Sequence, residues 1–72
     1  MITKDFFKER LRQLRKERGE TQAQVGEATG LGERHYQKFE LGTYLPSVEN
    51  LCLLADHFEV SVDYLLGRTD ER

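Results

Sequence analysis

The chain has 72 residues, of which 38% are hydrophobic and 33% are charged, and its formal net charge at neutral pH is −2. This balance is typical of one small globular domain and excludes a disordered chain or a separate substrate-binding domain. No apolar run approaches the roughly 20 residues that a membrane span needs, and the N-terminus has no hydrophobic core of a secretory signal. A single cysteine excludes an intramolecular disulfide, so we expect a cytoplasmic protein with no membrane partner.

The charges are divided unevenly along the chain. Residues 1–38 carry nine lysines and arginines against six acids, a local charge of +3, whereas residues 39–72 carry two against seven, a local charge of −5. Because the local field near a contact matters most, such a chain can be oriented on a polyanion although its total charge is negative.

The apolar spacing predicts helices along the first half of the chain. Phe7, Leu11 and Leu14 share one face of a helix that extends roughly over residues 3–18 and ends at Gly19. Thr21 begins a capping box, a threonine followed three residues later by glutamine, and so predicts a second helix over residues 22–29. We expect this helix to bury Val25 together with residue 28 or 29.

Three further helices are expected. The third extends over residues 33–41, with Tyr36 and Phe39 facing the core and a glycine stop behind it. Ser47 caps the fourth, whose apolar residues run from Val48 to Phe58, and a last short helix covers residues 62–66. No hairpin signal or internal repeat is present, so the sequence predicts an all-α fold of five short helices around one core.

The second and third helices are separated by Gly30-Leu31-Gly32. Two helices joined by a short glycine-containing turn form a helix-turn-helix, whose second helix can enter the DNA major groove while the first braces it. The same glycines lack the lysine and hydroxyl residue of a phosphate-binding loop, so we interpret them as a turn.

Several motifs in register resemble one family over residues 7–67. They are LRQLRKERGETQ, the turn glycine Gly30 with Leu31, FELG, PSVENL and VSVDYLLG. Together they resemble the Cro/repressor-type (XRE) helix-turn-helix domain. The resemblance implies a compact five-helix, lambda-repressor-like domain over residues 1–67, with the helix-turn-helix in helices two and three and a polar tail, expected to fray, over residues 68–72. It also implies operator binding by a two-fold dimer, with no catalysis and no cofactor.

The resemblance places the third helix in the major groove, with base contacts from its solvent side: Glu33, Arg34, Gln37 and Lys38. Arg34 and Lys38 suit guanine, although a solvated charged face is the alternative. Gln37 suits adenine or a phosphate, and Glu33 either accepts from cytosine or repels phosphate to narrow the choice of site.

Contacts to the DNA backbone are implied at six positions: Arg15, Thr21, Gln22, His35, Thr43 and Tyr44. The family register also sets Arg15 opposite Glu40, and we expect an exposed pair that orients the arginine and adds little stability. Four further cations are expected to serve solubility: Arg10, Arg12, Lys16 and Arg18.

The sequence departs from the family pattern at several places. Gly32 replaces a serine or threonine cap, Gly26 an alanine and Thr29 a leucine, and each change is expected to weaken helix or core slightly. Thr43 and Tyr44 stand where basic residues often follow the glycine, which removes two charged phosphate contacts. The Tyr44 hydroxyl or the backbone amides of the loop can replace part of this loss.

Three leucines allow two interpretations. Leu53, Leu65 and Leu66 either cover the edge of the core or form part of a self-complementary homodimer patch. Cys52 and His57 lie about 140° apart on a helix and lack a third ligand, so we expect no metal site there. We expect Cys52 to be a small, buried hydrophobic residue instead.

These features predict a sequence-specific DNA-binding transcriptional regulator, a dimeric repressor with a double-stranded DNA operator as partner. The alternative is a protein-interaction module of the same fold, antitoxin-like or bound by an antirepressor, which the acidic total and the missing basic loop favour. An enzyme is the class that the sequence supports least.

Overall fold

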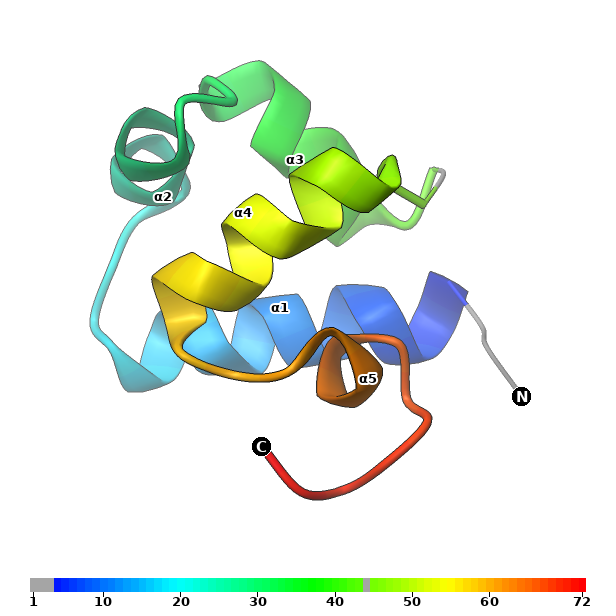
Figure 1. The fold of residues 1–72 in the computed structure, drawn as a ribbon. Helices are drawn as coiled ribbons and strands as arrows, with labels where there is room; N and C mark the ends of the chain where they lie inside the picture. The colour runs from blue at the N-terminus through cyan, green and yellow to red at the C-terminus, as the bar shows by residue number, and fades with distance from the viewer. Residues whose placement is uncertain (1–3, 44) are drawn as a thin grey trace.

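The computed structural model describes residues 4–43 and 45–72. Over these residues it contains five helices and no strand (Figure 1): α1 Lys4–Glu17, α2 Gln22–Thr29, α3 Glu33–Leu41, α4 Val48–Phe58 and α5 Val62–Leu65. The predicted all-α fold is confirmed. The bounds of α2 and α3 are as predicted, and α1 and α5 are slightly shorter than expected.

Hydroxyl side chains fix where three of these helices begin. Before α2, α4 and α5, the capping side chain accepts a hydrogen bond from the backbone N–H three residues later, which satisfies a donor that the helix itself leaves free. The caps are Thr21, Ser47 and Ser61. The capping box is also complete, because the Thr21 backbone N–H donates to Gln24 Oε1 at 2.8 Å.

The helices close around one core. The α1 helix packs against α3 and α5, α2 packs against α3 and α4, and α4 packs against α5 (Figure 1). All five helices contribute buried side chains: Phe7, Leu11, Leu14, Val25, Tyr36, Phe39, Leu51, Leu54, Ala55, Phe58, Tyr64 and Leu65. Tyr36 and Phe39 are therefore core residues of α3, as predicted.

The C-terminal tail lies back on the helices. Arg10 donates to the carbonyl oxygens of Tyr64 and Thr69 and to the carboxylate of Asp70 at 2.7 Å. Arg72 forms a two-pronged pair with Glu17 at 2.7 and 2.8 Å. The tail was expected to fray, but here side chains of α1, which are distant from it in the sequence, hold it in place.

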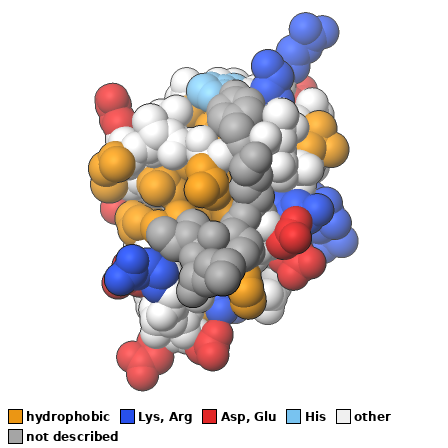
Figure 2. Space-filling view, turned by 90° about the vertical axis from the view of Figure 1, so that its right-hand side faces the viewer, with side chains coloured by type: hydrophobic (Ala, Val, Ile, Leu, Met, Phe, Trp, Pro, Cys, Tyr) orange, Lys and Arg blue, Asp and Glu red, His pale blue; other side chains and the backbone are white. Residues whose placement is uncertain are grey.

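Helix α4 buries less of its apolar sequence than predicted. Val48 is 76% exposed. Cys52, predicted to be buried, is also exposed. Both residues lie outside the stripe formed by Leu51, Leu54 and Phe58, which faces the core. Exposed hydrophobic side chains gather on the face near the beginning of α1 and the loop between α3 and α4 (Figure 2).

Candidate nucleic-acid interface

The turn between α2 and α3 is held by two glycines. The Gly32 backbone N–H donates to the Gly26 carbonyl oxygen at 2.9 Å. A Cβ atom built on Gly26 would lie 2.5 Å from the Gly32 carbonyl carbon and 2.6 Å from the Glu33 backbone nitrogen. Real Cβ atoms do not approach backbone so closely, so Gly26 permits the contact that sets α3 against α2.

The surroundings of Gly26 and the backbone of Gly32 add to two sequence-based expectations. We expected Gly26 to weaken α2, but the missing side chain is what allows α3 to begin beside it. We also expected Gly32 to be a slightly weaker version of a serine cap. Gly32 has a φ of +89° and no side-chain cap bond, and a residue with a Cβ would be strained there. The two glycines that depart from the family pattern thus act together to allow the close contact between α2 and the start of α3.

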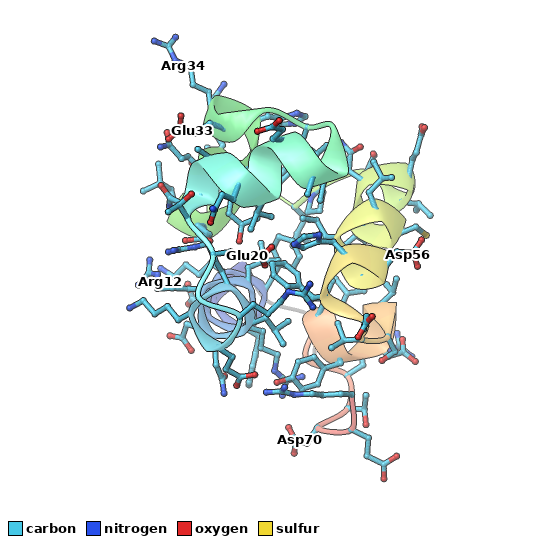
Figure 3. All side chains as sticks on the ribbon, turned by 90° about the vertical axis from the view of Figure 1, so that its left-hand side faces the viewer. Arg12, Glu20, Glu33, Arg34, Asp56 and Asp70 are labelled. Carbon is cyan, nitrogen blue, oxygen red and sulfur yellow. The ribbon has the colours of Figure 1, made fainter. Side chains whose placement is uncertain are left out.

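Helix α3 has one buried and one exposed face. Tyr36, Phe39 and Glu40 are buried. Glu33, Arg34 and Lys38 are exposed, whereas Gln37 and His35 are partly buried. Figure 3 shows Arg34 extending away from the body of the molecule, with Glu33 beside it and Arg12 on the same side, and Asp56 and Asp70 lying elsewhere. The proposed base-contacting positions therefore share one accessible side of α3.

A hydrogen-bonded network runs from α1 to α3 beneath this face. Arg15 Nε donates to Glu40 Oε2 at 2.7 Å, and Arg15 Nη2 donates to Glu40 Oε1 at 3.1 Å. Gln22 Nε2 donates to Glu40 Oε1 at 3.1 Å. Gln22 Oε1 in turn accepts from Gln37 Nε2 at 3.1 Å. The network thus joins α1, the first residue of α2 and the exposed side of α3.

The pairing of Arg15 with Glu40 is confirmed, but the pair is not exposed. The Glu40 side chain is 2% exposed and that of Arg15 is 16% exposed. Burial acts to raise the pKa of Glu40, but hydrogen bonds from Arg15 and Gln22 and the positive charge of Arg15 outweigh it and lower that pKa. The hydrogen bond to Glu40 raises the pKa of Arg15. Both groups are therefore charged at neutral pH.

Three donors of Arg15 are directed into the protein. Its remaining terminal nitrogen, Nη1, donates to the Glu20 carbonyl oxygen at 3.1 Å. These three bonds use three of the five N–H donors of the guanidinium, which leaves one N–H on each terminal nitrogen for the expected phosphate contact. The structure thus gives Arg15 a positioning part, holding α3 through Glu40 and the α1–α2 connection through Glu20.

Comparison of the sequence with known protein families agrees with this geometry. The helix-turn-helix family matches residues 11–65, which cover α2, the turn and α3. The chain belongs to the Cro/repressor-type (XRE) helix-turn-helix family. The resemblance stated from sequence motifs is therefore confirmed.

Curated relatives of this helix-turn-helix chain are named as regulators. It is 47% identical over 67 residues to the cryptic phage CTXphi transcriptional repressor RstR of Vibrio cholerae, covering 90% of this chain and 60% of that protein. It is 41% identical over 66 residues to the uncharacterized HTH-type transcriptional regulator YobD of Bacillus subtilis, covering 92% and 59%. It is 34% identical over 64 residues to the HTH-type transcriptional regulator AnsR of Bacillus subtilis, covering 89% and 55%. The chain thus spans less than two thirds of each relative, and no solved structure matches it.

The expected backbone-contacting positions of this family member lie around α3. Thr21 is exposed at the start of α2, where its hydroxyl is used as a cap, and Gln22 follows it. Thr43 is exposed just after α3. The ring of His35 lies 4.8 Å from that of Phe39, on the flank of the exposed face. Tyr44 lies outside the described residues.

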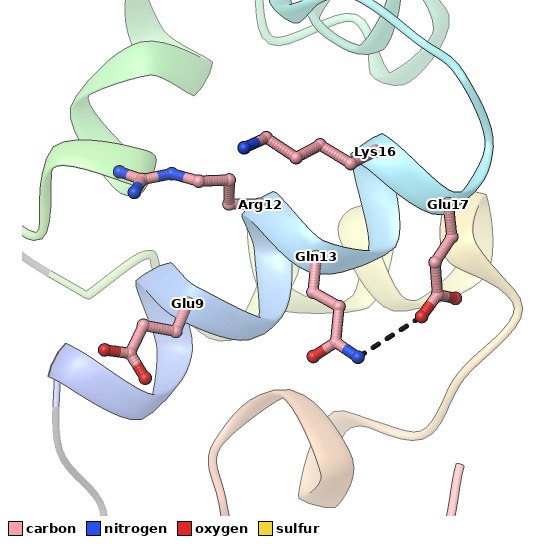
Figure 4. A pocket seen from close by; sticks show the side chains of 5 residues that line it. All are labelled: Glu9, Arg12, Gln13, Lys16 and Glu17. Carbon is pink, nitrogen blue, oxygen red and sulfur yellow. Dashed lines mark hydrogen bonds between the residues drawn. The ribbon is translucent and has the colours of Figure 1, made fainter.

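Two cations of α1 that were expected to serve solubility lie where they are also candidates for contacts to the DNA backbone. Arg12 and Lys16 are exposed, and Figure 4 shows both extending on the α3 side of α1, away from Gln13 and Glu17. Arg12 also reaches the Glu40 carbonyl oxygen at 3.5 Å. Their spacing of four residues places them on one helix face. That spacing is visible in the sequence, but which face of α1 borders α3 is not.

The three leucines considered for a dimer patch differ in how deeply the structure buries them. Leu53 is 40% exposed, Leu66 packs partly exposed against the core, and Leu65 is fully buried. Leu65 cannot line an interface between folded subunits, because it fills the junction between α5 and the core. Including it in the patch was wrong, and Leu53 and Leu66 are the candidates that remain.

The described residues offer no cluster of three or more histidine, cysteine and acidic side chains suited to a metal ion. His57 Nε2 instead lies 3.0 Å from Glu20 Oε1, which also accepts from Arg18. This contact joins α4 to the connection between α1 and α2. Among the described helices, none has the length and apolar character that crossing a membrane requires.

Proposed function

We propose that this protein is a sequence-specific regulator of transcription that inserts α3 into the major groove of double-stranded DNA. The observation that supports this most directly is the division of α3 into a buried face and an exposed polar face that nothing in the described chain covers. The major groove admits one α-helix and offers a distinct pattern of donors and acceptors at each base pair.

The exposed side chains suit different base edges. Arg34 and Lys38 carry donors that match the O6 and N7 acceptors of guanine. Glu33 has a carboxylate that accepts from the cytosine amino group and repels nearby phosphates. Their opposite charges on one helix face favour a sequence with a defined arrangement of donors and acceptors over non-specific attraction to the DNA backbone.

Contacts to phosphate position the helix. The N-terminus of α2 is the positive end of the helix dipole and directs backbone N–H groups away from the helix, so phosphate fits beside Thr21 and Gln22. Thr43 and His35 border the same face. Arg12 and Lys16 extend the positive surface along α1. These groups fix the position of α3 along the DNA and do not contribute to recognition of the bases.

The protein acts as a homodimer in this proposal. Two copies related by a two-fold axis place their α3 helices in successive major grooves, about 34 Å apart along the DNA. Leu53 and Leu66 supply an apolar contact for the second copy. The repressor name of one relative and the regulator names of the others favour this function over the protein-interaction module weighed above.

Selection of bound sites from a random DNA library tests the proposal, because it reports affinity, site symmetry and half-site spacing together. The selected site is then titrated with Arg34→Ala and with Arg68→Ala, an exposed arginine of the C-terminal tail paired with Asp63 at 3.5 Å. We expect Arg34→Ala to lose about 1–3 kcal/mol of binding free energy and to relax preference at one base pair. Arg68→Ala should bind as the unaltered protein does.

Two results count against the proposal in different ways. If Arg34→Ala weakens binding equally on every sequence, Arg34 contacts a phosphate and does not read a base. If the unaltered protein selects no DNA from the library at low salt, the proposal of a DNA-binding regulator is wrong.

A further inference from the structure

Two glutamine side chains link a buried carboxylate to the exposed face of α3. Glu40 accepts from Gln22 Nε2 at 3.1 Å, and Gln22 Oε1 accepts from Gln37 Nε2, also at 3.1 Å. Gln37 Nε2 lies 3.5 Å from Glu33 Oε2 as well. The chain of contacts therefore begins in the core beside Arg15 and ends at a position proposed to face DNA.

The chemistry of Glu40 decides which way both amides point. An ionised carboxylate accepts hydrogen bonds and cannot donate them, so Gln22 must turn its NH2 group toward Glu40. Its carbonyl oxygen then faces Gln37, which must likewise turn its NH2 group inward. Both N–H groups of Gln37 thereby have acceptors, one on Gln22 and one on Glu33.

The ionisation on which this direction depends is secured by the surroundings of Glu40. Although burial alone would raise the pKa of Glu40, hydrogen bonds led by that from Arg15 lower it. At neutral pH the carboxylate is charged and cannot reverse the direction of the chain. The only hydrogen-bonding group that this leaves for an outside partner on the Gln37 side chain is its carbonyl oxygen.

We propose that the Glu40–Gln22 relay makes Gln37 an acceptor that selects an amino base, adenine or cytosine, on the DNA strand it faces. The inference rests on the proposed DNA-binding function. A free glutamine reads adenine with two hydrogen bonds, one to the N6 amino group and one to N7. Here the N–H groups are used within the protein, so Gln37 makes one bond to an amino group and none to N7. Gln22 and Glu40 are positioning residues.

The first experiment uses the site selected from the random library. Every base pair of one half-site is replaced in turn, and binding is measured for the unaltered protein, Gln37→Ala and Gln13→Ala. Gln13 is a matched control, since within the described part of the chain its side chain bonds to Glu17 on α1, at 3.3 Å, and not to the relay. We expect one position at which adenine or cytosine is preferred about 2- to 10-fold, a preference lost in Gln37→Ala and kept in Gln13→Ala. Preference for guanine or thymine at that position, or no change in Gln37→Ala, overturns the inference.

Base analogues then separate one bond from two. Replacing adenine by purine, or cytosine by 2-pyrimidinone, removes the amino group and should weaken binding about 2- to 10-fold. For adenine, replacement by 7-deazaadenine removes only N7 and should leave binding unchanged. Gln22→Met removes the acceptor of one Gln37 N–H group, which can then donate to DNA. If the selected base is adenine, binding should become sensitive to 7-deazaadenine. If it is cytosine, the variant should also accept bases with a keto group at that position. Sensitivity of the unaltered protein to 7-deazaadenine, or an unchanged base preference in Gln22→Met, contradicts the relay.

A measurement without DNA tests the relay itself. By NMR, the side-chain amide protons of Gln22 and Gln37 should exchange with solvent more slowly than those of Gln13, and Gln22→Met should remove the protection of Gln37. Equal exchange at all three glutamines overturns the inference even if DNA is bound. Slow exchange together with no binding to any DNA sequence instead shows that the proposed function has failed, and the base selection with it.

Discussion

A carboxylate that is almost fully buried needs partners for both oxygens, and Glu40 has them from two helices. Arg15 occupies both oxygens, and Gln22 shares one of them. Such charge-assisted, two-pronged bonds are stronger and more directional than neutral ones. At the scale of single residues, this cluster holds α1 and the start of α2 against α3.

We expect Glu40→Gln to lower the free energy of unfolding by about 2 kcal/mol at pH 7, because charge-assisted hydrogen bonds are lost from a buried site. The pKa of Glu40 is lower in the folded protein than the ordinary value of 4.5. Its contribution is therefore complete above about pH 4.5 and declines as the pH falls through the lower, folded pKa. Urea unfolding at pH 7 and at pH 3 should show the difference between protein and variant shrinking at the lower pH.

Glu71→Gln is the control for this experiment, because Glu71 is exposed in the tail. It should change the free energy of unfolding by less than about 0.5 kcal/mol at either pH. A difference between Glu40→Gln and the unaltered protein that stays constant or grows toward pH 3 would contradict the assigned pKa shift.

At the scale of elements, the approach of α3 to α2 depends on an absent side chain. Replacing Gly26 by alanine gains up to about 1 kcal/mol of helix propensity. It also drives a methyl group to 2.5 Å from backbone carbon. Backbone cannot move aside as a flexible side chain does, so the clash should outweigh the gain.

Gly26→Ala is therefore expected to lower the free energy of unfolding by about 1–3 kcal/mol and to weaken DNA binding beyond that loss, because α3 shifts on its support. Ala28→Gly tests the propensity of the same helix at an exposed position and should cost at most about 1 kcal/mol without altering base preference. Chemical unfolding and site titration measure both variants. A Gly26→Ala protein as stable as the original would show that the close contact is not maintained in solution.

The sequence predicts the helices well because caps and periodicity are local properties. Thr21 with Gln24 fixes the start of α2, and the apolar stripe of α1 defines its inward face. Depth of burial is different, because it depends on which neighbour covers each face. For this reason Cys52, predicted to be buried, is exposed, and Leu65, for which a core position and a dimer patch were both considered, is fully buried.

Of the candidate site, too, one part could be predicted from the sequence and another part could not. The family resemblance identified Arg34 and Lys38 as candidates, and both are exposed on α3. The contact between Gln22 and Gln37 joins residues 15 positions apart on two helices and follows from their crossing, which no local pattern encodes. The same holds for Gly26, whose value comes from the backbone of residue 32 lying against it.

At the scale of the whole molecule, self-association is tested by Leu53→Lys. A charge at this 40% exposed position should weaken a dimer contact by interrupting apolar surface, while the circular dichroism of the helices stays unchanged. Sedimentation velocity measures the effect. Val48→Lys is the control, because Val48 lies on the same helix but about 140° away and is already 76% exposed. Equal sedimentation of Leu53→Lys and the unaltered protein removes Leu53 from the interface.

The distribution of charge over the molecule determines how binding responds to salt. Each phosphate neutralised by the protein contributes about −0.9 to the slope of log affinity against log salt. Lys16 lies on the α3 side of α1, whereas Arg68 lies in the tail beyond α5. We therefore expect Lys16→Gln to weaken binding equally on all sequences and to reduce the slope by about 1 for each subunit whose Lys16 meets a phosphate. Arg68→Gln should leave the slope unchanged. Titrations across a series of salt concentrations distinguish the two, and a loss of base preference in Lys16→Gln would show that α1 does more than hold the phosphate backbone.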